Sequence, residues 1–339
     1  MTFLPSSDEL EFQEAVRRFL AQEHDCGTIR RVYRSGPAER EGIAASCRDF
    51  GMLEWVREGG IRAVALLARE AGRALIAAPV VTDALWGVWL PSVVVGMPWG
   101  VDEACAGAVR VCAALEGLSV GTLVEGAPGA RYLVEICSKL GEVAIYNLEE
   151  GSFVPIAPLD GTMVLGELQR ALPEPVARVS VDRAALRFLR AAWRLIHAAQ
   201  VIGAAERCVE LFQDHGRTRK QFGVPIAGFQ AVQQQAAAHF ANLAAASALT
   251  SFAEWCGVHD HDQFEEAALS AWHAAVRMGR PLAEAMVQIH GGIGFTWEYD
   301  LHLYLRRIVA LELLYPLTVE EERQLLGGLS GGGKGDEQR

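Results

Sequence analysis

The sequence predicts an α+β protein of several domains, in which two helical regions flank a middle region of short strands. Helical spacing of apolar residues dominates residues 1–98 and returns over 183–326. Residues 99–182 have the short, β-branched, turn-punctuated segments that are typical of strands. The chain has 339 residues, 51% of them hydrophobic and 22% charged, which suffices for a large core and more than one domain.

The first region, residues 1–98, is expected to form an N-terminal helical domain. Ser6 and Glu9 have the spacing of a capping box ahead of an apolar-periodic run. A second long helix is expected over "EGGIRAVALLAREAGRALIAA", ending at Pro79. The apolar run 84–99 is too short to span a bilayer and contains two prolines, so we expect a buried helix end and loop, and no membrane span.

The middle region, residues 99–182, is expected to form a small β domain. The segments "SVGTLVEG", "ARYLVEIC", "EVAIYNL" and "ARVSV" are short and are separated by Gly, Pro and acidic residues. Their spacing is typical of a small antiparallel sheet or barrel.

Residues 183–326 are expected to form a C-terminal bundle of long, alanine-rich helices. Small residues let such helices approach one another closely. One apolar stripe on the first helix comprises Leu186, Leu189, Trp193, Ile196, Gln200 and Gly203. The glycine-rich, charged segment 327–339 is expected to be a disordered tail.

Charge and cysteine content exclude several function classes. A net charge of −11 without a long basic stretch argues against nucleic acid as a partner. Seven scattered cysteines without a C-x-x-C spacing indicate reduced thiols and a cytoplasmic location. No metal site is expected, because the adjacent residues His259–Asp262 cannot all face one ion. Three further histidines lie within predicted helices and are expected to be structural: His197, His239 and His273.

Two glycine-containing motifs have the chemistry to bind a diphosphate or adenine. The first is "RTRKQFGVPIAGFQAV", Arg217–Val232, which is cationic and then turn-like. The second is "QIHGGIGF", residues 288–295, where glycines allow backbone to approach a ligand. The second motif is not a dinucleotide fingerprint, since a helix precedes it and Trp297 occupies the third glycine position. Taken singly, either motif could equally be a loop that connects two helices.

In this order and between these helices, the two motifs resemble those of the acyl-CoA dehydrogenase family. "RKQFG-x-PI-x-x-FQ" and "QIHGGIGF-x-x-E" match the family's flavin-contacting motifs without gaps, and "EAGRALIAAPV" resembles its N-terminal helices. The helical, strand, helical order also agrees over the whole chain. The resemblance implies an N-terminal helical domain, a small middle β-barrel or sheet, shortened here, and a C-terminal four-helix bundle.

The resemblance also implies a cofactor and partners. Family members oxidise an acyl-CoA with FAD and pass the electrons to an electron-transfer flavoprotein. Each FAD is shared between neighbouring subunits. On this basis Arg219, Gln221 and Phe222 are expected to reach a partner's FAD pyrophosphate. A second group of residues is expected along the adenosine: Gln288, Gly291, Gly292 and Gly294.

This sequence departs from the family where the catalytic base is expected. Ungapped counting from the motifs places the family's two base positions at Tyr315 and Trp193, and neither residue is an acid. The family's T-E-P, G-S-D and W-I-T segments, which hold flavin and thioester, are missing between 99 and 182. The resemblance therefore implies no catalytic residue here, as in the non-catalytic β-type subunit of heteromeric α2β2 enzymes.

A β-type subunit implies a homologous catalytic subunit as its partner. It also implies an acyl-CoA substrate, and by analogy with the family's heteromeric enzymes this is a steroid side-chain CoA thioester. Two alternatives remain. The chain could be a self-sufficient flavoenzyme with a displaced base, for which Glu312 is the best candidate because it lies one helical turn before Tyr315. It could also be a scaffold that has lost flavin.

Overall fold

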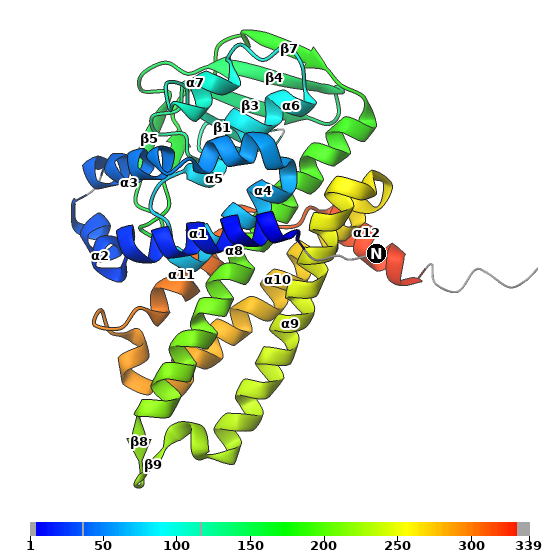
Figure 1. The fold of residues 1–339 in the computed structure, drawn as a ribbon. Coiled ribbons are helices and arrows are strands. Elements are labelled where there is room, and N and C mark those ends of the chain that lie inside the picture. Colours follow the sequence, from blue (N-terminus) through cyan, green and yellow to red (C-terminus); the bar gives the residue numbers. More distant parts are fainter. Residues whose placement is uncertain (1–4, 36, 116, 331–339) are drawn as a thin grey trace, which may run out of the picture.

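The computed structural model describes residues 5–35, 37–115 and 117–330 and has the predicted α+β architecture. The strands lie at one end of the molecule, the N-terminal helices pack beside them, and the long bundle helices extend away (Figure 1). The predicted fold class is therefore confirmed: along the chain, helical regions precede and follow a small strand region. No helix in the described part of the chain is both long and apolar enough to cross a bilayer.

The N-terminal domain consists of helices that pack around α4, Met52–Ala74. The predicted capping box is present at α1, where the Ser6 hydroxyl accepts a bond from the Glu9 amide at 3.3 Å. Helix α4 ends at Leu75 in a left-handed conformation, before the predicted stop at Pro79. The other elements are α1 Ser7–Glu23, α2 Cys26–Ser35, α3 Pro37–Asp49, α5 Val80–Thr82, the π-helix η1 Asp83–Trp89 and α6 Leu90–Val93.

The middle domain contains two separate sheets and a short helix, α7 Val101–Cys105, and its described strands close no barrel. The first sheet has the order β1 (Val111–Leu115), β3 (Tyr132–Cys137), β4 (Glu142–Asn147), β7 (Ala177–Ser180). The second has the order β2 (Leu123–Glu125), β6 (Leu165–Leu168), β5 (Phe153–Ile156). The expectation of antiparallel pairing was wrong for β1 and β3, which are parallel. The chain leaves β1 to form β2 in the other sheet and then returns in the same direction.

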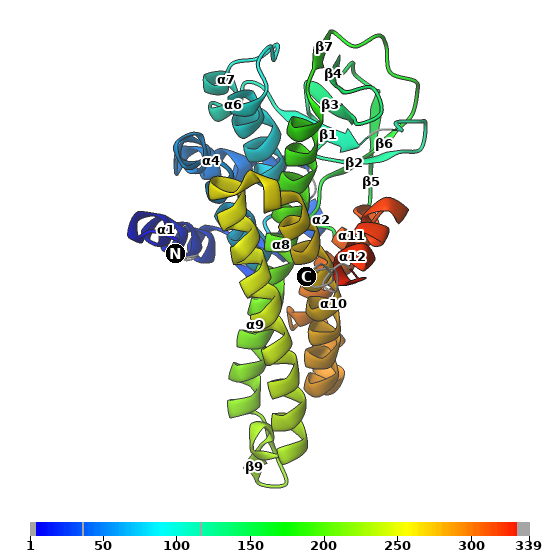
Figure 2. The same ribbon diagram turned by 90° about the vertical axis from the view of Figure 1, so that its right-hand side faces the viewer.

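The C-terminal domain is a bundle of four long helices, as expected (Figure 2). They are α8 Arg183–Thr218, α9 Gln230–His259, α10 His261–His290 and α11 Leu301–Leu314. A hairpin of β8 Lys220–Gln221 and β9 Val224–Pro225, followed by η2 Ile226–Gly228, joins α8 to α9. The 3-10 turn η3, Gly291–Phe295, joins α10 to α11. Helix α12, Val319–Ser330, occupies the start of the segment expected to be disordered, and residues 331–339 lie outside the described residues.

Two glycines bring α4 into backbone contact with α8. A Cβ atom on Gly72 would lie 2.0 Å from the Gln200 carbonyl oxygen, and one on Gly203 would lie 1.8 Å from the Arg69 carbonyl oxygen. Both distances are far below any permitted contact, so only glycine fits at this crossing. The crossing fixes the N-terminal domain against the middle of α8.

A buried arginine connects the three domains. Arg307 of α11 forms an ion pair with Asp160 of the middle domain. The Arg307 guanidinium also donates to the Thr162 hydroxyl at 2.6 Å and to the Ile76 carbonyl oxygen at 3.2 Å. These charge-assisted bonds hold the middle domain against α11, two helical turns before Tyr315.

Candidate functional site

The two positions at which a catalytic base was sought lie side by side in the core. The ring of Tyr315, just after α11, meets the ring of Trp193 in α8 edge-on at 5.8 Å between centroids. Tyr315 also stacks on His197, with centroids 3.7 Å apart and planes within 16°. Trp86 of the π-helix packs edge-on against Trp193 at 5.0 Å. Four aromatic rings from three segments therefore fill this place.

Little space remains between these rings. A cavity of about 10 Å³ is left, which is the volume that one water molecule needs and no more. It is lined by Val81, Thr82, Leu85, Trp86, Ala113, Glu125, Trp193, Ile196, His197, Gln200 and Tyr315. An acyl thioester could enter only if several of these side chains moved.

A carboxylate that the sequence reasoning missed also lies here. Glu125, at the end of β2, accepts a hydrogen bond from the Tyr315 hydroxyl at 2.7 Å. Burial raises the pKa of Glu125, and the bond from Tyr315 opposes that shift. Burial, together with the Glu125 charge, also raises the pKa of Tyr315, so the phenol keeps its proton and acts as the donor. An acid at the end of a three-residue strand has no sequence signal that would assign it to this place.

His197 was expected to be structural, and the structure shows how it packs. The side chain is buried, and burial lowers its pKa well below the usual value, with the Arg194 charge adding to the effect. The ring is therefore neutral and can lie flat on Tyr315. Gln200 lies 3.4 Å from Nδ1, whereas Nε2 has no hydrogen-bond partner.

Arg194 fixes the turn that presents Tyr315. Its guanidinium donates to the carbonyl oxygens of Tyr315 at 2.8 Å and Pro316 at 2.9 Å. It also forms a two-pronged contact with the Glu321 carboxylate of α12, at 3.0 and 2.7 Å. Because Arg194 is itself buried, these charge-assisted bonds fix the turn against α8 and α12.

Glu312, the candidate displaced base, is not part of this cluster. Its carboxylate accepts a bond from Arg280 of α10 at 2.8 Å, and its side chain is 32% exposed. It does not line the small cavity beside Tyr315. The structure thus brings Glu125, and not Glu312, to the place where a base was sought.

The first glycine-containing motif lies at the far end of the bundle, on the surface. Arg219 follows the last turn of α8, and Gln221 and Phe222 belong to the β8–β9 hairpin (Figure 1). The Phe222 side chain is 94% exposed and its φ of 51° is unusual for a bulky residue. With Gly223 at φ 82°, it forms the tight two-residue turn of the hairpin.

The second motif lies against the same end of α8. The ring of His290, beside Gly291, stacks on His215 at 4.2 Å, one turn before Arg219. A Cβ atom on Gly291 or Gly292 would meet nothing within 4 Å, and both residues are exposed.

Two further residues of the second motif occupy different environments. Gln288 is exposed on the last turn of α10. Gly294, by contrast, is buried, and a Cβ atom there would lie 2.7 Å from the Val287 carbonyl oxygen, so a larger residue does not fit without a shift.

These residues fit the diphosphate portion of a nucleotide cofactor at the level of chemistry. An exposed guanidinium at Arg219 and side-chain-free backbone at Gly291 and Gly292 are what an anionic diphosphate requires. The core beneath Tyr315 offers no comparable room, since its free volume is about 10 Å³. The two predicted sets of site residues thus differ: the first is exposed except at Gly294, whereas the second is packed among aromatic rings.

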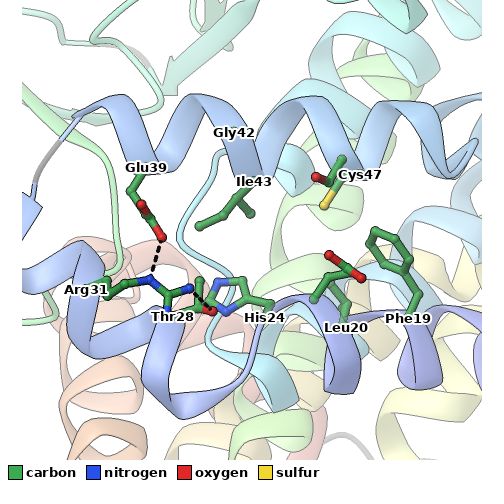
Figure 3. Close-up of a pocket in the computed structure, with 11 residues that line it drawn as sticks. Phe19, Leu20, His24, Thr28, Arg31, Glu39, Gly42, Ile43 and Cys47 are labelled. Atoms are coloured by element: carbon green, nitrogen blue, oxygen red, sulfur yellow. Dashed lines mark hydrogen bonds and ion pairs between the residues drawn. The ribbon is translucent and has the colours of Figure 1, made fainter.

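Another cavity, of about 260 Å³, lies between α1, α2 and α3 (Figure 3). The polar groups on its wall bind one another: Arg31 donates to Glu39 at 2.9 Å and to the Thr28 hydroxyl at 2.8 Å. No residue of either motif lines it. Among the described residues, no cluster of three His, Cys, Asp or Glu side chains could hold a metal ion.

Comparisons with known proteins agree on one family. A family model described as "Acyl-CoA dehydrogenase, C-terminal domain" matches residues 183–314. "Acyl-CoA dehydrogenase IpdE2" of Mycobacterium tuberculosis is 31% identical over 290 residues, covering 80% of this chain and 85% of the relative.

Two solved heteromeric structures are similar in fold. The chain matches the ChsE4-ChsE5 complex from Mycobacterium tuberculosis with a TM-score of 0.80 at 19% identity, covering 98% of this chain and 99% of the other. It matches a "Tcur3481-Tcur3483 steroid ACAD" variant with a TM-score of 0.76 at 19% identity, covering 96% and 98%.

Proposed function

Since the chain belongs to the acyl-CoA dehydrogenase family, we propose that it is the non-catalytic, β-type subunit of a heteromeric FAD-dependent acyl-CoA dehydrogenase. The observation that carries the proposal is the filled reaction site. Tyr315, Trp193, His197 and Trp86 occupy it, leaving a cavity of about 10 Å³. A homologous catalytic subunit then supplies the base and the space for the acyl thioester.

The role assigned to this chain is to complete the partner's cofactor site. The FAD pyrophosphate, held mainly by the partner, is approached by Arg219, Gln221 and Phe222. The glycine turn of the second motif, residues 291–295, lies along the adenosine. The exposure of Arg219, Gly291 and Gly292 supports this role, because the chain's own packing does not require these three residues. Bound FAD supplies the hydride acceptor for α,β-dehydrogenation, and an electron-transfer flavoprotein receives the electrons.

The proposed assembly is α2β2 and the proposed substrate is a steroid side-chain CoA thioester. Two fold neighbours whose names join two unlike chains support the heteromer, and one of these is described as a steroid enzyme. Both neighbours are 19% identical to this chain, so they support its fold directly, and the steroid substrate is proposed by analogy with them.

Purification of the chain alone, and after co-expression with each homologous acyl-CoA dehydrogenase chain of the same organism, tests the proposal. Alone, the chain is expected to bind little FAD and to show no substrate-dependent bleaching of flavin absorbance. The co-purified complex is expected to be yellow and active. A yellow, active homo-oligomer would overturn the proposal, and a colourless complex would favour a scaffold without flavin.

Glu125 favours a second candidate, a self-sufficient flavoenzyme with a displaced base. Its carboxylate lies 2.7 Å from the Tyr315 hydroxyl, so an acid is present where the sequence offered only Glu312. That candidate requires the aromatic rings to move aside on substrate binding. Flavin bleaching by the chain alone, abolished by Glu125→Gln, would establish it in place of the non-catalytic subunit.

A further inference from the structure

A hydrogen-bond bridge lies directly beneath the exposed glycine turn. His290 is the last residue of α10, and its Nδ1 lies 2.6 Å from the Met286 carbonyl oxygen. Its Nε2 lies 3.1 Å from the Tyr299 hydroxyl oxygen. The same hydroxyl lies 3.1 Å from the Leu211 carbonyl oxygen of α8. One phenol, in the segment between η3 and α11, therefore connects the end of α10 to α8.

The protons of the bridge can be assigned from its neighbours. Burial lowers the pKa of His290, so the neutral ring donates from Nδ1 to Met286. Nε2 then accepts the Tyr299 proton, and the Leu211 carbonyl oxygen is the alternative acceptor for that proton. The hydroxyl has one proton, so at any moment it bonds either His290 or Leu211, and its oxygen lies within 3.1 Å of both acceptors.

Ring packing places the same bridge under the first motif. The imidazole of His215 stacks on that of His290 at 4.2 Å, and the edge of Tyr299 meets His215 at 5.9 Å. The His215 carbonyl oxygen accepts a bond from the Arg219 amide at 2.8 Å. The rings of His290, Tyr299 and His215 thus pack together. They link the end of α10, just before the glycine turn, to the last helical turn of α8, just before Arg219.

The glycine turn, residues 291–295, is packed at Gly294 but open at its start. Gly291 and Gly292 have open space where a side chain would be, and they are exposed. After the turn, Arg30 of α2 donates to the Trp297 carbonyl oxygen at 2.9 Å and pairs with Asp300. Tyr299 makes the matching attachment toward α8, between these two anchors.

We propose that Tyr299, acting through His290, is a positioning residue that fixes the glycine turn relative to Arg219 so that both motifs reach one FAD. This inference rests on the proposed function, since it assumes that the two motifs share a cofactor. One part of the inference, that the hydroxyl of Tyr299 orders residues 291–295, depends only on the hydrogen bonds described above and not on FAD. The two halves can therefore be tested separately.

Amide hydrogen exchange of the chain alone tests the bridge. Tyr299→Phe keeps the ring but removes the hydroxyl, so exchange in residues 291–295 is expected to accelerate about tenfold. Tyr146→Phe is the matched control, because the Tyr146 hydroxyl also donates to a buried partner, Glu135, at 2.9 Å in the middle domain. It is expected to leave exchange in 291–295 unchanged. Equal exchange in the two variants would overturn the proposal.

Flavin titration of the co-purified complex tests the cofactor half. Tyr299→Phe is expected to raise the dissociation constant for FAD about tenfold, and Tyr146→Phe to leave it unchanged. A complex that holds FAD equally tightly in both variants would overturn the positioning role, however the amides exchange. If the unaltered complex binds no FAD, the proposed function fails, and the exchange experiment still decides whether the bridge orders the turn.

Discussion

Two regions of α8 have opposite character, although predicted site positions lie in or beside both. Near its start, Trp193 and His197 lie in a core where the remaining cavity measures about 10 Å³. At its end, Arg219 is exposed beside Phe222, whose side chain is 94% exposed. At 1.5 Å per residue, about 39 Å of helix separates Trp193 from Arg219.

The difference teaches that predicted site positions of one chain can be packed into its core in one region and left exposed in another. Aromatic rings stabilise the first region by burial and stacking, contributions that any folded chain can use. An exposed phenylalanine at positive φ contributes nothing comparable to the fold, and holding it there carries a cost. The exposed end is therefore expected to tolerate changes that the buried end does not.

The largest expected contrast comes from placing the same acid in each region. Trp193→Glu removes a buried ring and buries a carboxyl group, which is expected to destabilise the chain by about 3–5 kcal/mol. Phe222→Glu, at the exposed end, is expected to change stability by less than about 0.5 kcal/mol. Urea unfolding of both variants checks this. Similar losses in the two variants would contradict the assignment of one region as core and the other as surface.

Arg219→Ala is expected to reverse the contrast, because it should affect the cofactor and spare the fold. Loss of a charge-assisted contact to a diphosphate costs about 1.5–3 kcal/mol, or roughly one to two decades in FAD affinity of the complex. Arg57→Ala is the control, since Arg57 is also exposed and bonds only to Asp102 among the contacts described, at 2.8 Å. Unchanged FAD affinity in the Arg219 variant would remove this residue from the cofactor site.

The buried hydroxyl of Tyr315 provides the next contrast. Tyr315→Phe leaves Glu125 without its donor, at an expected cost of about 1–3 kcal/mol. The cost should depend on pH. Burial raises the pKa of Glu125 above its ordinary 4.5. Protonation of Glu125 therefore contributes fully to the free energy of unfolding below pH 4.5, and this contribution declines as pH rises through the raised pKa.

Removing the hydroxyl takes away a bond that favours the carboxylate, which moves the pKa of Glu125 further up. The loss from Tyr315→Phe is therefore expected to be larger at pH 7 than at pH 5, as measured by urea unfolding at both. In a Glu125→Gln background this difference should disappear. A loss that is the same at both pH values would show that the Glu125 carboxylate does not depend on Tyr315.

Local sequence patterns predicted the elements of this fold better than its contacts. The capping box at Ser6, the strand texture of 99–182 and the long alanine-rich helices depend on neighbouring residues, and all are present. The parallel pairing of β1 and β3 depends on the path between sheets, which local texture does not encode. The family resemblance, confirmed by a relative that is 31% identical, rested on contiguous motifs.

The candidate site shows the same limit. Positions Tyr315 and Trp193 could be found by counting, but the carboxylate beside them could not, since Glu125 lies 190 residues from Tyr315 in sequence. A base was sought along the helix, and Glu312 was the nearest acid. The actual neighbour came from a strand of another domain, which Arg307 holds against α11 through Asp160. Such contacts exist only after the domains have packed.

Glu312→Gln is expected to have the smallest effect and separates the two carboxylates. Its partner Arg280 also donates to Glu284 at 2.9 Å, so loss of one partly exposed ion pair should cost about 0.3–1 kcal/mol. Because Glu312 does not line the cavity beside Tyr315, flavin bleaching by acyl-CoA in the complex should not change. Glu125 does line this cavity, so Glu125→Gln is the comparison variant with the same chemical change. Loss of bleaching in the Glu312 variant alone would mean that the bundle rearranges on substrate binding to bring that acid inward, and that the closed core is one of two states.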